Sequence, residues 1–191
     1  MGIVLSAFAL LAASVACGLS LAVALRVKKL LDPLTEEGVM SRRREEGPRE
    51  GAVVPRTPTL IDADGMEVDL PFAGPDPWVL TFQAVGCSGC KLQLPAYKKF
   101  LRDTGVDRDR VFSVIVGDVE GVSFYNDELG ELGRVVHASG DAFKLVQGLG
   151  VSVFPTYLVV DGGGKVMVSS QSSSLLADVG VASLTPALVG G

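Results

Sequence analysis

The hydrophobic pattern changes character at about residue 27. Residues 3–25 contain no charged side chain and are predominantly apolar. A helix of about 20 apolar residues is long enough to span the hydrocarbon core of a bilayer. A cleaved signal peptide would start with basic residues and have a shorter apolar core, whereas no Lys or Arg precedes this run. The pattern therefore predicts an uncleaved transmembrane anchor over residues 1–27.

The next segment, residues 28–56, mixes charge with Pro and Gly and offers few apolar side chains to bury. Its densest charged run is residues 42–46, three Arg followed by two Glu. A segment of this composition cannot bury enough apolar surface to offset the entropy lost on ordering the chain. We therefore expect a charged, flexible linker.

From residue 57 onward short apolar runs alternate with polar turns, which predicts a folded domain over residues 57–171. The runs 78–83 and 111–116 are apolar on both faces, as strands inside a parallel sheet are. Asp64-Gly65 between two alternating segments predicts a β-hairpin. The other predicted elements are helices ending near 103 and spanning 120–132 and 142–147, the last capped by Asp141, and strands over 134–137, 157–160 and 165–168. This order predicts an α/β domain with a mixed central sheet flanked by helices.

Residues 172–191 carry few strong helix signals and contain Thr185-Pro186 close to Gly191. We expect a short C-terminal helix or a tail there.

One motif stands between the strand 78–83 and the helix that follows it. Cys87-Ser88-Gly89-Cys90 places two thiols three residues apart. Unpaired backbone N–H groups and the positive end of the helix dipole favour a thiolate at a helix N-terminus. Cys87 is therefore the expected nucleophile. Cys90, one turn further on, is the expected resolving thiol, which attacks a mixed disulfide formed by Cys87. The pattern is typical of a dithiol redox centre.

Two other interpretations of the cysteine pair stay open. A zinc site usually takes four Cys or His ligands, and the chain has three Cys and one His, with Cys17 inside the apolar N-terminal run. His137, the single His, falls on a predicted strand, so we expect no metal. A purely structural disulfide is the other interpretation, although short Cys-x-x-Cys loops at helix starts are more often exchange-active.

Composition narrows the class of partner. The net charge is −5, so nothing favours binding to nucleic acid. The mean hydropathy of +0.38 is high for a soluble domain, and much of it comes from the first 25 residues. The remainder of the chain has the more ordinary balance of a folded domain with a charged linker.

The chain resembles the thioredoxin superfamily, and within it the membrane-anchored TlpA/ResA-like and MauD-like thiol–disulfide oxidoreductases. Four features carry the resemblance, which covers roughly residues 57–170: the Cys87 and Cys90 motif at a helix start, Pro95 inside that helix, Val153-Phe154-Pro155-Thr156 before a strand, and the Asp161-Gly162 turn of the hairpin that follows. The resemblance implies a thioredoxin-like fold with an N-terminal β-hairpin, behind a single N-terminal transmembrane helix.

The same resemblance implies roles for individual residues. Pro155 would be cis and lie against the cysteine pair, and the backbone of Phe154 would bind an extended substrate segment. Gly86, Ser88 and Gly89, which flank the pair, would complete the substrate-binding surface. Cys87 and Cys90 would form an internal disulfide in the oxidised protein. This redox-active disulfide would serve without any further cofactor.

The chain also departs from the family pattern. The family usually has Trp immediately before the first Cys and an acid or amide six residues before it, where this chain has Gly86 and Thr81. Thr81 can hydrogen-bond but cannot act as a base. A peroxiredoxin-like peroxidase is an alternative function, but it would need Thr where Ala84 stands. A redox-inactive binding module or metallochaperone using the same face is the alternative from another class.

The expected function is a membrane-tethered thiol–disulfide oxidoreductase that reduces or isomerises disulfides of extracytoplasmic proteins. Its expected partners are a protein disulfide substrate, an integral-membrane electron donor and, through the N-terminal helix, the cell membrane, with no nucleic acid. Arg26, Lys28 and Lys29 follow the anchor, and the positive-inside rule would place the domain in the cytoplasm. A tethered dithiol domain suits an oxidising compartment, so we expect the extracytoplasmic side.

Overall fold

The computed structural model describes Arg26 and residues 47–56, 59–72 and 74–176. The predicted anchor, apart from Arg26, and most of the predicted linker lie outside these residues. Within the described ranges, no helix combines the length and the hydrophobicity that crossing a membrane requires.

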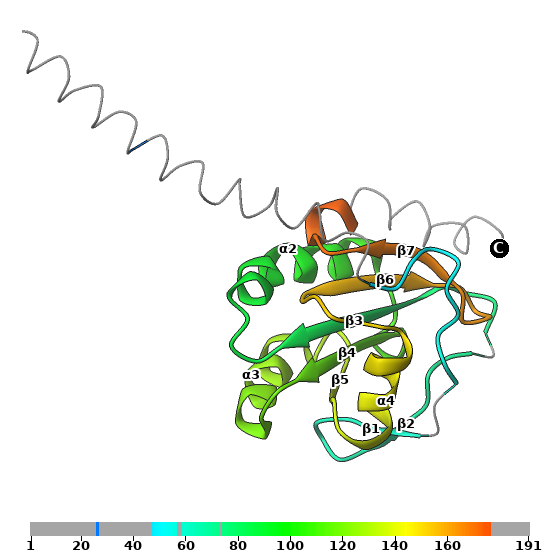
Figure 1. Ribbon diagram of the computed structural model, residues 1–191, viewed down its shortest axis with the longest axis horizontal. Coiled ribbons are helices and arrows are strands. Elements are labelled where there is room, and N and C mark those ends of the chain that lie inside the picture. Colours follow the sequence, from blue (N-terminus) through cyan, green and yellow to red (C-terminus); the bar gives the residue numbers. More distant parts are fainter. Residues whose placement is uncertain (1–25, 27–46, 57–58, 73, 177–191) are drawn as a thin grey trace, which may run out of the picture. The chain divides into compact units, whose positions relative to one another are not determined.

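A five-stranded mixed sheet forms the centre of the domain, with the strand order β5-β4-β3-β6-β7 (Figure 1). The strands are β3 (Trp78–Ala84), β4 (Val111–Val116), β5 (Arg134–His137), β6 (Thr156–Val160) and β7 (Val166–Ser170). β3, β4 and β5 are parallel, whereas β6 pairs antiparallel with β3 and with β7. The predicted mixed sheet is therefore confirmed, with each predicted strand of the sheet present within two residues of its expected ends.

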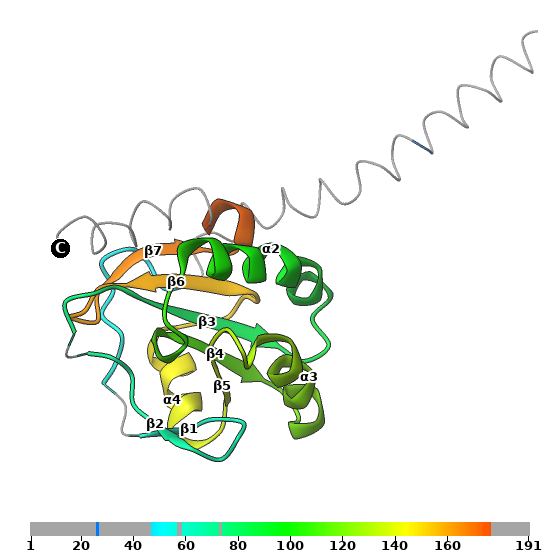
Figure 2. The same cartoon turned by 180° about the vertical axis from the view of Figure 1, so that it is seen from behind.

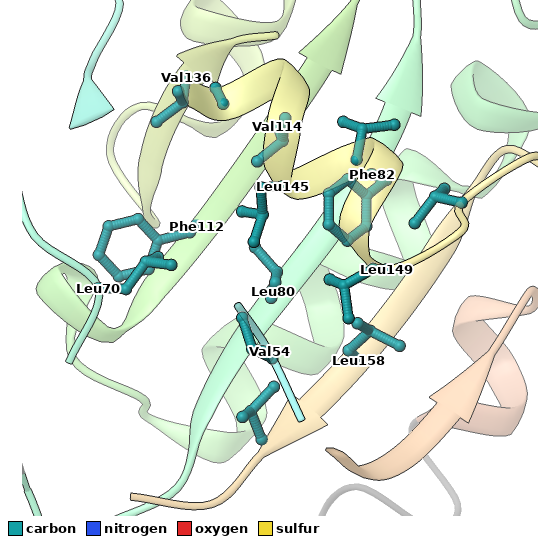
Figure 3. Close-up of a cluster of buried hydrophobic side chains, with 14 of the residues drawn as sticks. Val54, Leu70, Leu80, Phe82, Phe112, Val114, Val136, Leu145, Leu149 and Leu158 are labelled. Atoms are coloured by element: carbon teal, nitrogen blue, oxygen red, sulfur yellow. The ribbon is translucent and has the colours of Figure 1, made fainter. Parts of the chain in front are cut away.

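Helices cover both faces of the sheet. α2 (Ser88–Thr104) and α3 (Val119–Leu129) pack on one face and α4 (Gly140–Gly148) on the other (Figures 1 and 2). Because side chains alternate along a strand, Trp78, Leu80 and Phe82 of β3 point toward α4. Figure 3 shows Leu80 and Phe82 packed with Leu145 of α4. Val79, and with it the other odd-numbered positions of β3, faces α2 and α3.

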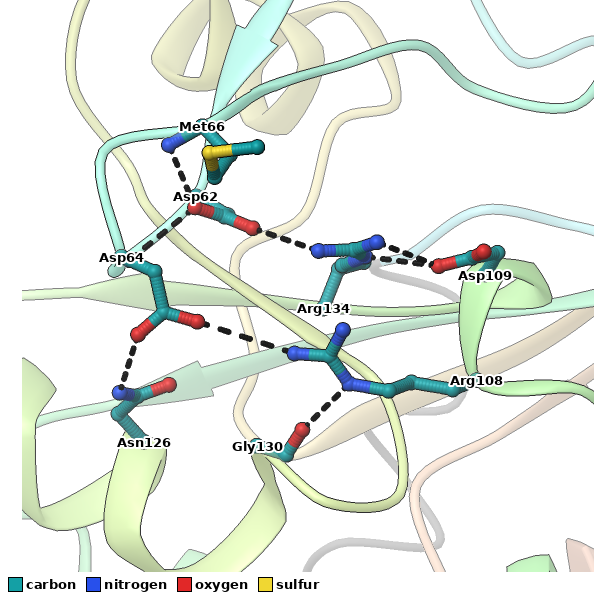
Figure 4. Close-up of polar contacts among 8 residues, drawn as sticks. All are labelled: Asp62, Asp64, Met66, Arg108, Asp109, Asn126, Gly130 and Arg134. Atoms are coloured by element: carbon teal, nitrogen blue, oxygen red, sulfur yellow. Dashed lines mark hydrogen bonds and ion pairs between the residues drawn. The ribbon is translucent and has the colours of Figure 1, made fainter.

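The predicted hairpin is present but short, with β1 (Leu60–Ile61) paired to β2 (Glu67–Val68). Its turn is held by the nearly buried carboxylate of Asp62, whose Oδ1 accepts a hydrogen bond of 2.8 Å from the backbone N–H of Met66. Arg134 of β5 donates to the other oxygen of Asp62 at 3.1 Å (Figure 4). Arg134 also contacts Asp109 of the short 3-10 helix η1 (Arg108–Arg110), at 2.6 Å. This ion-pair network fastens the hairpin to the edge of the main sheet.

Residues on both sides of the predicted domain, 57–171, also contact it. The backbone N–H groups of Gly51 and Val54 donate to the carbonyls of Val166 and Gly164, each at 2.8 Å. Val54 is only 1% exposed and belongs to the core under α4. Part of the range predicted as linker therefore pairs with the sheet, and the buried side chain of Val54 joins the core whereas Val53 is exposed. At the other end a helical turn over 173–176 buries Leu176.

One predicted cap is also wrong. α4 begins at Gly140 after Ser139, so Asp141 lies inside the first turn rather than before it. Its carboxylate accepts from Lys144 Nζ at 2.6 Å, one turn along the same helix. In contrast, Asp118 caps α3, with its Oδ1 accepting a hydrogen bond of 2.6 Å from the backbone N–H of Gly121.

Candidate redox site

The candidate site begins where β3 turns into α2. Gly86 lies between them with a φ of +77°, a conformation in which a side chain is strained. This gives a physical reason for glycine at a position where the resembling family usually has Trp. Cys87 is the N-cap residue of α2, and its Sγ accepts a hydrogen bond of 3.1 Å from the backbone N–H of Cys90.

Cys87 and Cys90 form a disulfide, with their Cα atoms 5.3 Å apart. The two sulfurs differ in surroundings, since Cys87 is half-buried whereas Cys90 has no exposed surface. Gly86 and Ser88, on either side of Cys87, are exposed. A partner molecule can therefore reach Cys87 but not Cys90, which is the asymmetry that a nucleophile and a resolving thiol need.

The loop before β6 lies against this disulfide. The Phe154–Pro155 peptide bond is cis, as the resemblance implies. The carbonyl oxygen of Phe154 is 3.7 Å from Cys87 Sγ. A Cβ atom built on Gly89 would lie 4.0 Å from Pro155 Cδ, so the first turn of α2 contacts the proline ring. The structure thus brings together the residues that the sequence assigns to the site.

The local electrostatics favour a negatively charged sulfur at Cys87. The first turn of α2 contains no acidic side chain. Lys91 lies in that turn, with its Nζ 4.9 Å from the ring centroid of Phe124 on α3. The positive end of the helix stabilises a thiolate relative to a thiol at this position.

A layer of buried polar side chains lies between α2 and the sheet. Thr81 Oγ1 donates to Ser113 Oγ at 3.1 Å, and both side chains are buried. Tyr97 of α2 packs on Tyr157 of β6, with ring centroids 5.1 Å apart. Burial raises the pKa of both tyrosines above their ordinary value, and for Tyr97 the nearby Thr81 and Ser113 hydroxyls offset part of this effect.

Gln83 is the residue of this layer that sequence reasoning missed. It has no exposed surface, and neither Nε2 nor Oε1 has a hydrogen-bond partner among the described residues. The available signal was an amide inside the apolar run 78–84, next to the cysteine motif. Because the run is otherwise typical of a buried strand, periodicity alone gave this position no functional meaning.

The structure also describes the residues on which the metal-site and peroxidase alternatives would depend. Within residues 47–56, 59–72 and 74–176, no three His, Cys, Asp or Glu side chains converge as metal ligands. His137 donates from Nε2 to the carbonyl oxygen of Gly117 at 2.8 Å. Ala84 stands at the end of β3 without a hydroxyl that could orient a peroxide.

Comparison with known proteins shows which fold the domain has. No family model and no curated protein sequence matches the chain. Among solved structures, the chain is similar to the thioredoxin domain of a thiol-disulfide oxidoreductase from Bacteroides vulgatus, with a TM-score of 0.59, 22% identity, and coverage of 71% of this chain and 98% of that one. The domain therefore has the thioredoxin fold.

Two further structures extend this likeness. A secreted disulfide oxidoreductase from Mycobacterium tuberculosis, described as homologous to DsbE of Escherichia coli, gives a TM-score of 0.55 at 15% identity and covers 67% of this chain and 96% of that one. A thioredoxin-family thiol:disulfide interchange protein from Chlorobium tepidum gives 0.57 at 17% identity, covering 71% and 99%. At these identities the likeness establishes the fold alone.

Proposed function

We propose that the protein is a membrane-tethered thiol–disulfide oxidoreductase that reduces or isomerises disulfides of extracytoplasmic proteins. The observation that carries this proposal is the unequal burial of the disulfide-bonded pair at the start of α2. Cys87 is half-buried against the carbonyl of Phe154, whereas Cys90, in the first turn of α2, has no exposed surface. The structural neighbours named as disulfide oxidoreductases support the same activity.

The reaction starts from the dithiol form. The Cys87 thiolate attacks one sulfur of a substrate disulfide, forming a mixed disulfide and releasing the other substrate sulfur, which takes up a proton. Cys90 then loses its proton and attacks Cys87, which breaks the mixed disulfide and frees the second substrate thiol. Two electrons and two protons pass to the substrate, and the Cys87–Cys90 disulfide remains. A membrane thiol carrier is the electron donor that would regenerate the dithiol.

The membrane part of the proposal rests on the sequence. Residues 3–25 provide an uncharged run long enough to span a bilayer. An oxidising compartment supplies the protein disulfides that such a domain would act on, so the domain is proposed to face outward from the cytoplasm.

The test uses the full chain in intact cells and a membrane-impermeant thiol reagent that shifts gel mobility. All variants carry Cys17→Ala, so that only Cys87 and Cys90 can be labelled. We expect label only after a mild reductant pulse, and we expect Cys90→Ala to accumulate mixed disulfides with other proteins while Cys87→Ala accumulates none. Label that requires permeabilised cells would overturn the outward orientation. A pair that the pulse does not reduce, with no trapped partner, would overturn the enzymatic proposal.

A further inference from the structure

The strongest unexplained feature of the domain is the side chain of Gln83. Burying an amide without hydrogen bonds is costly because its polar groups lose their bonds to water, so native proteins rarely keep one without a reason. Both polar atoms of Gln83 are unpaired among the described residues, in the form of the protein that contains the disulfide. By contrast, the buried hydroxyl of Thr81 on the same strand face is paired with Ser113.

Strand register and helix rise point to a position for Gln83 close to Cys90. Thr81 is the register partner of Tyr157, on which Tyr97 of α2 packs, so the Tyr97 turn of the helix lies above Thr81. Cys90 is seven residues nearer the start of α2, or about 10 Å along the helix. Gln83 is about 7 Å beyond Thr81 along β3, on the same face and toward the same end of the sheet.

A second line of contacts leads to the same placement. Phe82 is the register partner of Thr156, so Gln83 lies beside Pro155 at the start of β6. The first turn of α2 contacts that same proline through Gly89. Gln83 and the buried face of the first turn, where Cys90 points inward, therefore share one neighbourhood.

Resting on the proposed function, we infer that Gln83 is a positioning residue whose amide binds the Cys90 sulfur in the dithiol form. In the disulfide, Cys90 Sγ has no proton to donate, and its bond to Cys87 fixes its position. Reduction adds two electrons and two protons to the pair and converts Cys90 into a thiol. That thiol can donate to Oε1 of Gln83, and the corresponding thiolate can accept from Nε2.

The hydrogen bond to Gln83 would shift the redox equilibrium of the cysteine pair in one direction. The dithiol gains a hydrogen bond that the disulfide lacks, so Gln83 stabilises the reduced form relative to the oxidised form. It also holds the resolving thiol in place until a mixed disulfide forms at Cys87. A pair biased in this way is a weaker reductant and is better suited to isomerising substrate disulfides, which is one branch of the proposed activity.

The experiment measures the equilibrium of the full chain with glutathione redox buffers. For Gln83→Leu we expect a shift of about tenfold toward the disulfide, which corresponds to about 30 mV in a two-electron couple. The matched control is Gln93→Leu, which replaces a glutamine of α2, the helix that carries Cys90. Gln93 is fully paired, donating to the carbonyl of Gln171 at 3.2 Å and accepting from the backbone N–H of Ser173 at 2.8 Å. Its loss should leave the redox equilibrium within about twofold of the wild type.

Stability in the two redox states separates this role from a purely structural one. Gln83→Leu should raise the urea midpoint of the oxidised protein and leave that of the reduced protein unchanged or lower. If both midpoints move equally, and the glutathione equilibrium does not move, Gln83 is satisfied alike in both states and the inference is overturned. Gln83→Met replaces Gln83→Leu if the latter does not fold.

A measurement on the wild type needs no variant. The side-chain amide resonances of Gln83 should shift on reduction, whereas those of Gln93 should not. A Gln83 resonance unchanged by reduction would contradict the inference. Failure of the proposed function would be distinct, because the wild-type disulfide would then not exchange with glutathione at all.

Discussion

The two faces of the central sheet treat buried polar groups differently. On the α4 face they are paired. The indole N–H of Trp78 donates to the carbonyl oxygen of Asp161 at 2.9 Å, and the hydroxyl of Thr156 donates to the backbone carbonyl oxygen of Val153 at 2.7 Å. On the α2 face, Gln83, Tyr97 and Tyr157 contain all four buried side-chain N and O atoms that lack a partner in the described residues. The unpaired groups thus gather on the face that carries Cys90. The α4 face therefore pairs its buried polar groups, whereas the face that carries Cys90 leaves several of them without hydrogen bonds.

The largest expected effect comes from the α4 face. Leu145 of α4 is fully buried among apolar side chains, and Leu145→Ala should lower the free energy of unfolding by about 3 kcal/mol, from lost transfer free energy and the cavity left behind. Urea denaturation of the oxidised and reduced proteins should give the same loss. A loss that depends on the redox state would show that the two faces are coupled and would break the comparison.

A smaller effect is expected from the paired group on the redox face. Thr81→Val removes the hydrogen bond to Ser113 while keeping the shape of the side chain, and should lower the free energy of unfolding by about 1 kcal/mol. The glutathione equilibrium should not change, because Thr81 lies under Tyr97 rather than under Cys90. If the equilibrium does change, the reactive environment reaches further along β3 than Gln83.

The smallest effect at neutral pH is expected for Tyr97→Phe, which removes a buried hydroxyl that lies near the Thr81 and Ser113 hydroxyls. The effect of this substitution on the free energy of unfolding appears at alkaline pH. Burial raises the pKa of Tyr97 above its ordinary value of 10.0, so above that pH the unfolded chain loses a proton that the folded chain keeps. Stability is therefore complete below pH 10 and is lost as the pH rises further, by about 1.4 kcal/mol per pH unit for each such group.

The measurement is the free energy of unfolding of the oxidised protein between pH 9 and about 12. The slope above pH 10 should be shallower for Tyr97→Phe than for the wild type by the contribution of one group. Leu92→Ala, which changes an exposed residue of α2 without a titratable group, is a control that should leave this slope unchanged. Identical slopes for Tyr97→Phe and the wild type would mean that the Tyr97 hydroxyl is not buried as the structure places it.

The sequence predicted the elements with strong local signals. Trp78–Ala84 and Val111–Val116 are nearly continuous apolar runs, and the Cys87 motif marks the start of α2 unambiguously. The cis bond at Pro155 followed from resemblance rather than from any local rule. What failed depended on contacts between distant residues. Val54 joins the core only through pairing with the start of β7, and composition cannot show such a partner.

The site shows the same division. The residue type and spacing of the two cysteines were enough to predict a dithiol redox centre. Gln83 stands out because its amide lacks hydrogen-bond partners in the described residues. The sequence cannot show this, since it depends on how α2 packs on the sheet. Asp141 shows the converse case, since a good capping residue was used instead for an ion pair with Lys144.

The pairing of residues 51–54 with the start of β7 has a consequence for access. Val53 bridges Lys165, at the end of the sheet where Trp78 begins β3 and Val160 ends β6. The disulfide lies at the opposite end, roughly 15 Å away along β6. Residues 51–54 therefore join the sheet at one end of the domain, whereas the disulfide lies at the other end. A partner protein docked on Cys87 would therefore meet the loop before β6 and the first turn of α2 rather than residues 51–54.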